Sequence, residues 1–544
     1  MSFQNDSELK ISDLSGEELT EFNEKAAVLE FDRGLSRIYA EQEALEHIRR
    51  KRADNLTHEI EFKNAGKILS FRAKSEYTDQ FDCYQNLLEK ALRETPINSF
   101  HPTEDGQMEA AEFYLNGLIR RTDGMGWLAY DFTEGRYRAD LAESLLRFCL
   151  QRLARERYDL RNSAEDTKEF FRFAEKAVTE PSTRHVEKLL ESRPSVFALP
   201  ADFDQSYYFI NCAGETYDLQ TGSHISSLPE HLHTKTTGYR PMPGECPIFR
   251  KFLDEITLED TELAEWIMRW FGYKLTGDIR APFIVNFHGG GRNGKGTLFH
   301  VMRQIMGSYA REIDEEIIVD TGKRGNVKNA LANLVGIRAG FAADVPAGSL
   351  NLADLKRITG GDEIVAERKY HDSFPFRPIV KLTFSSNHML RLPETGQAMK
   401  SRLRYVPFKA SFVGREDTGL EDRILKEAPQ ILDWLIKEAG EYLKNPGPKG
   451  FPPCRTIDEA TENYIKEEDV IGQFLEERTA EAPYNTIQAR ALYDEYLQWA
   501  GGRGDKRTLS SQAFGRRMTE RNLEKEHNRQ GWWYKNIKIR GVYE

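Results

Sequence analysis

The sequence predicts an α/β fold built on a parallel sheet, with a mainly helical region before it and a winged helix-turn-helix after it. Three observations predict this arrangement. Residues 283–297 read in direct succession as an apolar strand, a glycine-rich loop and the start of a helix. Two further apolar strands follow at residues 334–344 and 379–385, as expected of a parallel sheet with helical connections. Three helical patterns, the third of them basic, and two short strands end the chain.

The glycine-rich loop has the composition of a phosphate-binding site. Glycines occupy five of the eight positions from 289 to 296. Without Cβ atoms, they let successive N–H groups turn toward one anion, and the helix that follows directs its positive dipole end to the same point. Lys295 supplies a mobile positive charge for the outer phosphates. The predicted nucleotide-binding residues are Gly289, Gly291, Asn293, Gly294, Lys295, Gly296 and Thr297.

The loop departs at one position from the usual phosphate-loop pattern. Gly-x4-Gly-Lys is present, but Gly296 occupies the place of the expected Ser or Thr, and Thr297 comes one residue later. The hydroxyl expected to bind Mg²⁺ is therefore displaced by one residue. A glycine-rich stretch alone is most often only a turn. Here the apolar strand before the loop and the amphipathic run at 298–302 after it favour a nucleotide site.

The length and composition of the chain exclude several classes of protein. With 544 residues the chain is too long for one hydrophobic core, so three or four domains are expected. No apolar run approaches the roughly 20 residues that cross a bilayer. The N-terminus lacks the basic start and apolar core of an export signal, and the five cysteines lie too far apart for a zinc site or a disulfide framework. We predict a soluble cytoplasmic protein without membrane contact.

Basic residues are concentrated at the C-terminal end. The whole chain has a net charge of −11, which speaks against a nucleic-acid coat over its entire surface. From residue 501 onward, however, eleven Lys and Arg residues face five Asp and Glu residues, a local charge of +6. Arg516 and Arg517 lie on the third helical pattern of the predicted winged helix, and we expect them to contact DNA.

Two polar residues follow the later strands of the predicted sheet. Asp344 ends the strand at 334–344, where a nucleotide enzyme needs a Mg²⁺ ligand or a base that orients water. An ordinary strand-end Asp is the alternative, and the order of the segments favours function. Asn387 follows the strand at 379–385, where its amide could contact the terminal phosphate.

Basic residues between and after these strands complete the candidates. Strand-like runs at 364–369 and 374–381 predict a hairpin with Lys369 and His371 near its tip. Arg402 and Arg404 precede another strand-like run and could place a guanidinium on a second nucleotide. Surface arginines are common, so only their place in this series of segments marks them out.

Two other patterns receive a structural interpretation. Asp202 and Asp204 are spaced like the paired acids of a polymerase centre. A proline precedes them, their flanks are polar, and no further cluster of acids and His accompanies them, so we predict a loop. The basic run at 49–52 could touch a phosphate backbone, but on a charged helix such a run is more often a solvated face.

Five ordered motifs resemble those of the superfamily 3 helicases of the AAA+ class, in particular the phage, plasmid and poxvirus primase-helicases. They lie at residues 289–297, 338–344, 356–362, 381–387 and 402–408. Five motifs in order are far more specific than one glycine loop, and the resemblance extends from about residue 100 to residue 544. Nothing before residue 100 resembles a polymerising primase domain, so primer synthesis is not implied.

The resemblance implies ATP and Mg²⁺ as cofactors and a role for each matching residue. Lys295 and Thr297 would contact phosphate and metal, Asp344 would be the acid of the second motif, and Asn387 would be the phosphate sensor. Asp344 stands where Glu is usual and is one methylene shorter. Asp344 could therefore contact the attacking water only through a second water molecule, or the rate of ATP hydrolysis could be low.

The resemblance also implies a ring, expected to be a hexamer, that moves along DNA with 3′ to 5′ polarity. Arg402 would reach into the nucleotide site of the neighbouring subunit. Lys369 and His371 would lie on a hairpin that grips DNA. Single-stranded and forked DNA are the expected partners, together with other replication proteins.

The expected function is an ATP-dependent, ring-forming DNA helicase in the replication of a phage, plasmid or related mobile element. Two alternatives stay open: an ATP-regulated DNA-binding initiator without processive unwinding, and a nucleotide kinase. The expected domains are a helical region of unknown role at 1–95, a mixed α/β region associated with primase-helicases at 96–245, a helical lead-in at 246–280, the AAA+ motor core at 281–415, a helical segment and linker at 416–466, and the winged helix-turn-helix at 467–544.

Overall fold

The computed structural model describes residues 58–64, 67–73, 80–140, 142–160, 168–204, 206–320, 327–367, 373–503, 508–521 and 523–540. The chain divides into two compact units, each described by itself below. The first comprises residues 1–205, 213–216 and 224–234, and the second comprises residues 206–212, 217–223 and 235–544. The basic run at 49–52 lies outside the described residues. The division predicted from the sequence is finer than these two units and stays a prediction.

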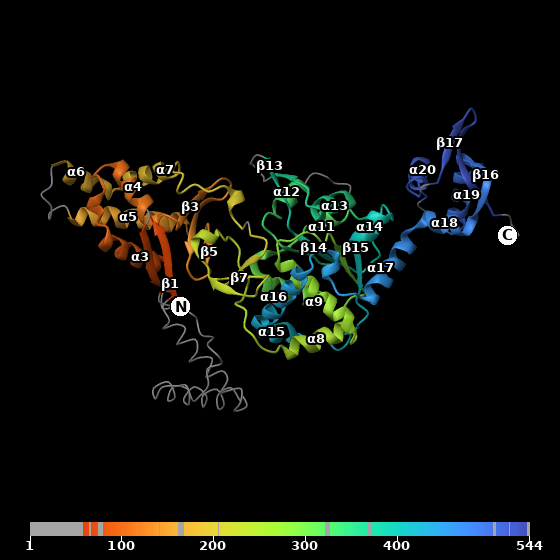
Figure 1. Ribbon diagram of the computed structural model, residues 1–544, viewed down its shortest axis with the longest axis horizontal. Coiled ribbons are helices and arrows are strands. Elements are labelled where there is room, and N and C mark those ends of the chain that lie inside the picture. Colours follow the sequence, from red (N-terminus) through yellow and green to blue (C-terminus); the bar gives the residue numbers. More distant parts are fainter. Residues whose placement is uncertain are drawn as a thin grey trace, which may run out of the picture. The chain divides into compact units, whose positions relative to one another are not determined.

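The first unit combines helices with short antiparallel strands (Figure 1). Its elements are β1 (His58–Asn64), β2 (Lys67–Ala73), α3 (Gln80–Glu94), α4 (Glu104–Leu115), β3 (Ile119–Thr122), β4 (Gly126–Asp131), β5 (Arg136–Arg138), α5 (Ala142–Asp159), α6 (Lys168–Ala177) and α7 (Glu180–Leu190). The antiparallel β1–β2 hairpin contradicts the prediction of helices throughout residues 1–95. Charged and apolar residues alternate from 59 to 62, which is the period of a strand and not of a helix.

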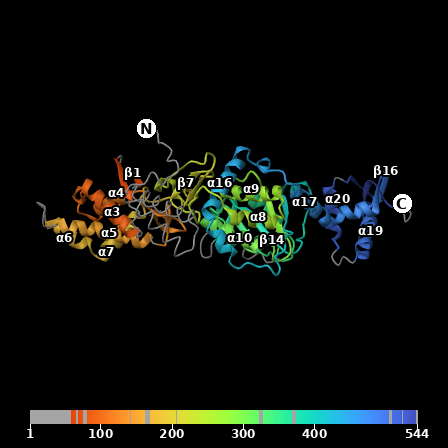
Figure 2. The same cartoon turned by 90° about the horizontal axis from the view of Figure 1, so that it is seen from below.

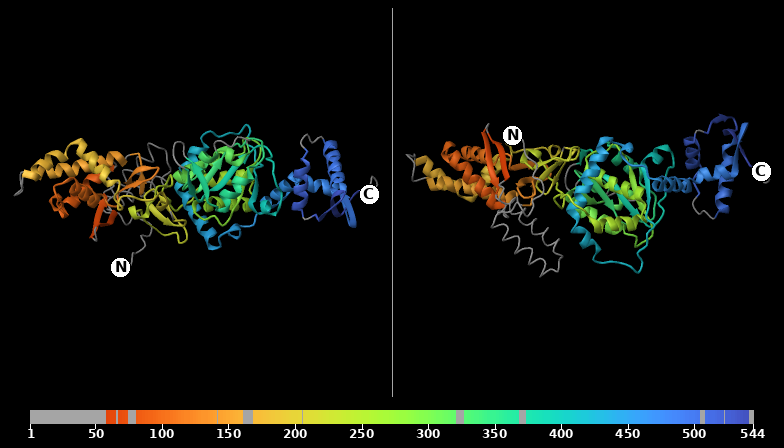
Figure 3. Two further views of the ribbon diagram at one scale, coloured as in Figure 1. Left: turned by 90° about the horizontal axis from the view of Figure 1, so that it is seen from above. Right: turned by 60° about the horizontal axis from the view of Figure 1, so that its bottom comes forward.

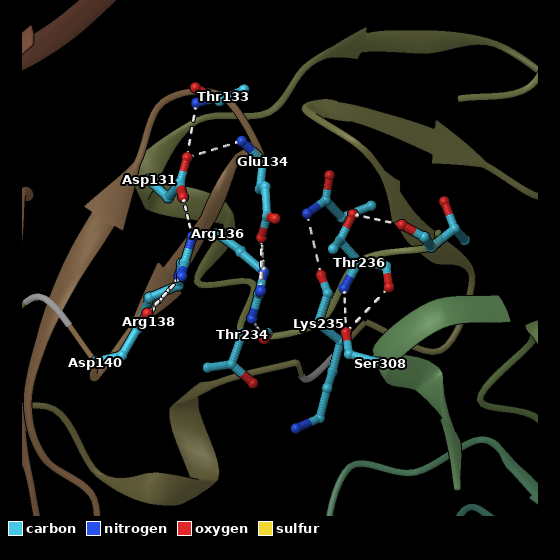
Figure 4. Close-up of polar contacts among 12 residues, drawn as sticks. Asp131, Thr133, Glu134, Arg136, Arg138, Asp140, Thr234, Lys235, Thr236 and Ser308 are labelled. Atoms are coloured by element: carbon cyan, nitrogen blue, oxygen red, sulfur yellow. Dashed lines mark hydrogen bonds and ion pairs between the residues drawn. The ribbon is translucent and has the colours of Figure 1, made fainter. Parts of the chain in front are cut away.

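Polar side chains fix the turn between β4 and β5 in the first unit. One Asp131 oxygen accepts the N–H groups of Thr133 at 2.8 Å and Glu134 at 2.9 Å, and the other accepts Arg138 Nη1 at 2.8 Å (Figure 4). Because Asp131 is buried, these bonds replace the water that its carboxylate would otherwise require. Asp202 ends a single 3-10 turn (Pro200–Asp202), so the prediction of a loop at this pair of acids is confirmed.

A five-stranded, all-parallel sheet forms the centre of the second unit. Its spatial order is β10 (Ala310–Glu312), β11 (Ala339–Ala342), β14 (Lys381–Ser386), β9 (Ile284–His288) and β15 (Leu403–Pro407). The predicted strands before the glycine loop and at 379–385 are confirmed as β9 and β14. Of the predicted strand at 334–344, only residues 339–342 form β11, and a turn precedes them. Since the strands are parallel, the segments that follow them all leave from one edge of the sheet.

Helices cover both faces of this sheet. Further helices and strands of the second unit up to residue 468 include β6 (Phe209–Cys212), α8 (Pro247–Thr257), α9 (Thr261–Leu275), α10 (Lys295–Met306), α11 (Glu315–Ile318), α12 (Val327–Ala332), α13 (Leu352–Gly360), β12 (Ile364–Glu367), β13 (Ser373–Phe376), α14 (Gln397–Arg402), α15 (Leu420–Leu425), α16 (Ala428–Lys444) and α17 (Arg455–Glu468). α9 and α16 lie side by side (Figures 1 and 2). Val285 and Phe287 of β9 belong to the core on one face, and Ile284 belongs to the core on the other.

Three buried cations join α9 to the sheet. Lys274 Nζ donates to Gly340 O at 3.0 Å and to Thr383 Oγ1 at 2.5 Å. Arg338 Nη1 donates to Leu275 O at 2.6 Å, and Lys381 Nζ donates to Thr276 O. Burial holds the pKa of Lys274 well below its usual value, and the nearby charge of Lys381 adds to this shift.

The C-terminal part of the second unit contains three helices and a three-stranded antiparallel sheet (Figure 3). In chain order its elements are α18 (Val470–Arg478), β16 (Thr479–Gln488), α19 (Ala489–Gly502), α20 (Ser511–Glu520), β17 (Lys525–Asn528) and β18 (Gly531–Ile539). The sequence predicted the three helices and the last two strands, but not β16. Pro483 lies within β16 and half of the residues of β16 are exposed, so the strand lacks the apolar alternation by which strands are recognised.

No helix among the residues that the structure describes is both long and apolar enough to span a bilayer.

Candidate nucleotide site at the glycine loop

The glycine loop joins β9, which lies between β14 and the edge strand β15, to α10, and its glycines serve two purposes. A Cβ at Gly289 would lie 2.2 Å from Phe408 O, and one at Gly294 would lie 2.5 Å from Ile256 Cγ2. Gly294 also has φ +85°, so packing and backbone both require glycine there. The other three loop glycines would have nothing within 4 Å of an added Cβ: Gly290, Gly291 and Gly296. These three line open space, as a surface that receives a ligand must.

Lys295 begins α10 and folds back over the loop. Its Nζ donates to Gly289 O at 2.7 Å, to Gly290 O at 3.3 Å, to Asn293 Oδ1 at 3.1 Å and to Asn387 Oδ1 at 3.3 Å. All four acceptors are uncharged, although the side chain is buried. Burial lowers the pKa of Lys295, and the carboxylate of Asp344 opposes that shift. A buried ammonium held only by neutral oxygens is suited to an anionic ligand that supplies the missing charge.

Asn387 connects Lys295 to the predicted acid. Its Nδ2 donates to Asp344 Oδ1 at 3.3 Å, while its Oδ1 accepts from Lys295. Asn387 directly follows β14, and Asp344 lies two residues beyond β11. Both side chains are exposed at the carboxyl edge of the sheet. The structure thus brings together three of the four residues predicted to be catalytic, from three neighbouring strands.

Asp344 has a backbone conformation that the sequence does not reveal. Its φ is +49°, a region that non-glycine residues seldom adopt, and its N–H donates to Ser385 Oγ at 3.0 Å. Arg292 within the glycine loop also has a positive φ of 58°. Uncommon backbone conformations of this kind cluster at functional sites, where surrounding contacts hold them in place.

His288 belongs to this edge, although the sequence pattern did not predict it. It is the last residue of β9, and its Nδ1 lies 3.3 Å from Ser386 Oγ. Ser386 Oγ donates in turn to Asn286 Oδ1 at 3.1 Å. Burial lowers the pKa of His288, and Lys295 and His388 lower it further. The only signal in the sequence was the position of His288 directly before Gly289.

Thr297 does not contact Asp344. Its Oγ1 donates to Glu421 Oε1 of α15 at 3.0 Å, whereas Asp344 bonds to Asn387. Within the described ranges, no group of three or more His, Cys, Asp or Glu side chains could hold a metal ion. The two predicted Mg²⁺ ligands therefore do not form a metal site by themselves. Mg²⁺ that is bound mainly by phosphates needs only one or two protein oxygens, so the phosphates would have to complete its coordination.

A cavity of about 1250 Å³ opens beside the glycine loop. Gly294 and Thr297 line it on the loop side, Phe252 lines it from α8, and residues between 410 and 423 form a further wall. Arg292 Nη1 pairs with Glu416 Oε1 at 2.6 Å at its margin. Ligand cavities for molecules of drug size measure about 300–1000 Å³, so this space is large enough for a nucleotide.

Two segments of the chain match known protein families. Residues 111–258 match the family described as D5 N terminal like, and residues 287–402 match a family of unknown function (DUF5906). The second segment contains Lys295, Asp344 and Asn387 and ends at Arg402.

Proteins of large DNA viruses are similar to parts of the chain. A "Putative helicase" of frog virus 3 (isolate Goorha) is 26% identical over 246 residues, which are 42% of this chain and 25% of that protein. A "Putative helicase" of Acanthamoeba polyphaga mimivirus is 23% identical over 329 residues, 55% of this chain and 33% of that protein. A "Putative primase" of African swine fever virus is 24% identical over 313 residues, 52% of this chain and 32% of that protein. The D5 N terminal like match and these viral relatives support a relationship of the chain to the phage and viral primase-helicase family.

The chain spans a quarter to a third of the length of the viral relatives it matches. Among solved structures, the apo structure of the NrS-1 C terminal region is 12% identical and has a TM-score of 0.40. That match covers 65% of this chain and 89% of the other. A second apo structure of the same region is 13% identical with a TM-score of 0.37, covering 66% and 90%.

Arg402 makes contacts within its own chain. It ends α14, and its Nη1 donates to Lys356 O at 3.2 Å and to Thr359 Oγ1 at 3.4 Å. Both partners lie in the last turns of α13, where a cation stabilises the exposed carbonyl groups. Arg404 lies 3.9 Å from the centroid of the Phe283 ring, and burial lowers its pKa. Arg404 therefore has a packing role, and Arg402 is the better candidate to reach another subunit.

The predicted DNA-contacting residues are only partly described. Lys369 and His371 lie outside the described residues; the flanking strands β12 and β13 pair antiparallel, as the hairpin prediction requires. Arg516 is exposed on α20. Arg517 is half-buried, and its Nη2 donates to Pro393 O at 2.5 Å. In this structure Arg516 is therefore the more accessible of the two arginines.

Proposed function

We propose that this chain is an ATP-driven DNA helicase that works as a ring in the replication of a phage, plasmid or related mobile element. The chain of hydrogen bonds from Lys295 through Asn387 to Asp344 carries the proposal. A cation, an amide and an acid meet beside an open glycine loop at the carboxyl edge of a parallel sheet. Ligands of open α/β sheets bind at this edge. The names of the viral relatives supply the link to DNA replication.

The residues of the site fit the triphosphate of ATP. The open loop glycines would present N–H groups to the phosphates, and Lys295 would exchange its carbonyl partners for phosphate oxygens. Bound Mg²⁺ would supply charge that stabilises the phosphoryl group during transfer. Thr297 would offer its hydroxyl to the metal after release from Glu421. Asp344 would accept a proton from, or orient, the attacking water, and Asn387 would hold Asp344 and Lys295 at a fixed separation.

The finer fold assignment belongs to the same proposal. The five-stranded sheet with its glycine loop fits a P-loop core of the AAA+ class and superfamily 3, and α18–α20 with β16–β18 fit a winged helix. Arg516 would contact duplex or forked DNA through the latter. Arg402 would leave α13 to stabilise charge on the phosphates held by a neighbouring subunit, which requires an oligomer such as a hexamer.

A DNA-binding initiator that uses ATP only to assemble is the second candidate. The hydrogen bonds of Arg402 within its own chain favour it, because in this arrangement the arginine reaches no other site. An initiator would hydrolyse ATP slowly and with indifference to single-stranded DNA. A nucleotide kinase is a weaker candidate, since a basic C-terminal segment has no use in that reaction.

Unwinding of a forked DNA duplex tests the proposal. The full chain should separate the strands with ATP and Mg²⁺, and should fail with a non-hydrolysable ATP analogue. Strand separation with the analogue, or ATP hydrolysis without any strand separation, would favour the initiator. Phosphoryl transfer to a nucleoside monophosphate in the absence of DNA would favour the kinase.

A further inference from the structure

Trp532 is an exposed aromatic residue at the tip of the β17–β18 hairpin. Half of its side chain is accessible, whereas Tyr534 two residues later on the same strand is buried. Exposed tryptophans are uncommon in folded proteins, because a large apolar ring gains free energy when it leaves water. We call residues 525–532 the aromatic tip.

Cationic and aromatic side chains surround this ring. Lys525 Nζ lies 4.8 Å from the centroid of the Trp532 ring, and the His527 ring lies 4.8 Å from it at an angle of 58°. His527 is paired with Trp532 across the hairpin, so the two side chains share one face. Neither Lys525 nor Arg529 makes an ion pair within the described part of the chain. Lys535 on the same hairpin differs, since it pairs with Glu526 at 2.9 Å.

The turn at the aromatic tip is held in one conformation. Asn528 Oδ1 accepts Gln530 N at 2.8 Å and Trp533 Nε1 at 3.1 Å. Gln488 Nε2 of the neighbouring strand donates to Gln530 O at 2.9 Å. Gly531 has φ +117°, which suits glycine alone. These contacts fix the turn that precedes Trp532, and Trp532 is half exposed in this arrangement.

We propose that the aromatic tip is a binding platform for an unpaired nucleobase of single-stranded DNA. The base stacks on the exposed surface of Trp532, and Lys525 and Arg529 attract the adjoining phosphates. This combination of an aromatic surface and cations that make no ion pair within the described part of the chain is how proteins bind single strands without reading their sequence. A protein partner fits less well, since the Trp532 ring with only Lys525 and His527 packed against it offers no extended apolar surface. The inference rests on the proposed function as a DNA-binding helicase.

The experiment compares two oligonucleotides of equal length and charge, a thymidine strand and an abasic strand. Fluorescence anisotropy measures their affinity for the full chain, for Trp532→Ala and for Trp532→Phe. Stacking disappears with the ring, so Trp532→Ala should weaken binding of the thymidine strand on the order of tenfold. Its affinity for the abasic strand should not change, and Trp532→Phe should recover most of the difference.

Tyr484→Ala is the matched control. Tyr484 is 99% exposed on the neighbouring strand β16, but no cation or aromatic ring of the described residues packs against its side chain, and it should contribute nothing to either affinity. Equal weakening on both strands, or an effect no larger than that of Tyr484→Ala, would overturn the platform.

ATP turnover distinguishes failure of the platform from failure of the proposed function. If the unaltered chain hydrolyses ATP and binds the thymidine strand while Trp532→Ala behaves identically, only the platform is refuted. If the unaltered chain does neither, the proposed function is refuted with it.

Discussion

At the scale of single residues, the candidate site depends most on the side chain of Asn387. Its two amide atoms contact Lys295 and Asp344, so it sets the relation between the phosphate contact and the acid. Neither contact involves the hydrophobic core, and the residue is exposed. Substitution should therefore affect catalysis and leave the fold intact.

Asn387→Ala should lower kcat for ATP hydrolysis by about 100-fold, with little change in KM, because a positioned polar group near the reacting phosphate acts mainly in the transition state. Asn387→Asp should be at least as slow, since it sets a second carboxylate beside Asp344. Gln397→Ala, which removes an exposed amide elsewhere, is the control. A large rise in KM with unchanged kcat would show that Asn387 only binds substrate.

Lys274 tests the electrostatics of the core. Its native pKa lies well below the usual 10.5, so the unfolded chain binds more protons in the interval between those two values. The free energy of unfolding must then rise with pH across that interval. Below the interval, burial of the charged amine destabilises the native state in full. Lys274→Met removes this destabilisation. The melting temperature of Lys274→Met relative to the unaltered chain should be highest near pH 7 and should fall as the pH approaches 10.5.

The exposed Lys437→Met serves as the control for this series and should show no pH-dependent difference. A difference for Lys274→Met that stays constant from pH 7 to pH 10 would mean that Lys274 titrates alike in both states.

The sequence predicted that Lys295, Asn387 and Asp344 lie at or beyond the ends of strands of one parallel sheet, and the structure brings these three residues together at one edge. Their roles in a reaction stay predictions. The sequence was not sufficient for the hydrogen bond between Thr297 and Glu421, which lie 124 residues apart in the chain. The positive φ of Asp344 was also hidden, since that conformation is imposed by Ser385 on the neighbouring strand and not by local sequence.

At the scale of elements, the sequence predicted β9, β14 and, within a longer predicted strand, β11, but not the edge strand β10 or the order of the strands in the sheet. Two further misses have physical reasons. The long strand β16 was not predicted, because a proline and several exposed residues interrupt the alternation of apolar and polar residues that is typical of a strand. The sequence analysis placed the β1–β2 hairpin in a helical region. The many charged residues around the hairpin obscured the alternation of charged and apolar residues within it. The last turns of α13 accept hydrogen bonds from Arg402. The sequence pattern indicated only a catalytic role between subunits for Arg402 and did not predict this contact.

Mixed assemblies of two variants decide between these roles of Arg402. If Arg402 completes the site of a neighbouring subunit, Arg402→Ala and Lys295→Ala should each be nearly inactive alone, and co-assembled mixtures should regain measurable ATP hydrolysis, because one interface then contains both intact residues. If Arg402 only caps α13, Arg402→Ala should melt several degrees lower and keep its ATP turnover per folded chain. No recovery in mixtures shown by mass to have exchanged subunits would argue against a shared site.

At the scale of the whole molecule, we assign ATP chemistry to the sheet and DNA contacts to the basic C-terminal segment. Removal of residues 468–544 should weaken binding of duplex DNA and reduce its salt dependence, by about one unit of slope for each phosphate that the segment no longer neutralises. ATP hydrolysis without DNA should persist. An unaltered salt slope in the truncated chain would mean that the C-terminal segment does not touch DNA.

The most direct measurement is the rate of ATP hydrolysis with and without single-stranded DNA for the unaltered chain and Lys295→Ala, with Lys437→Ala as a control of equal charge change on α16. We predict hydrolysis that single-stranded DNA stimulates in the unaltered chain and in Lys437→Ala. In Lys295→Ala the rate should fall by about 100-fold or more at an unchanged melting temperature. Hydrolysis by Lys295→Ala at the parental rate would contradict the assignment of the glycine loop as the nucleotide site.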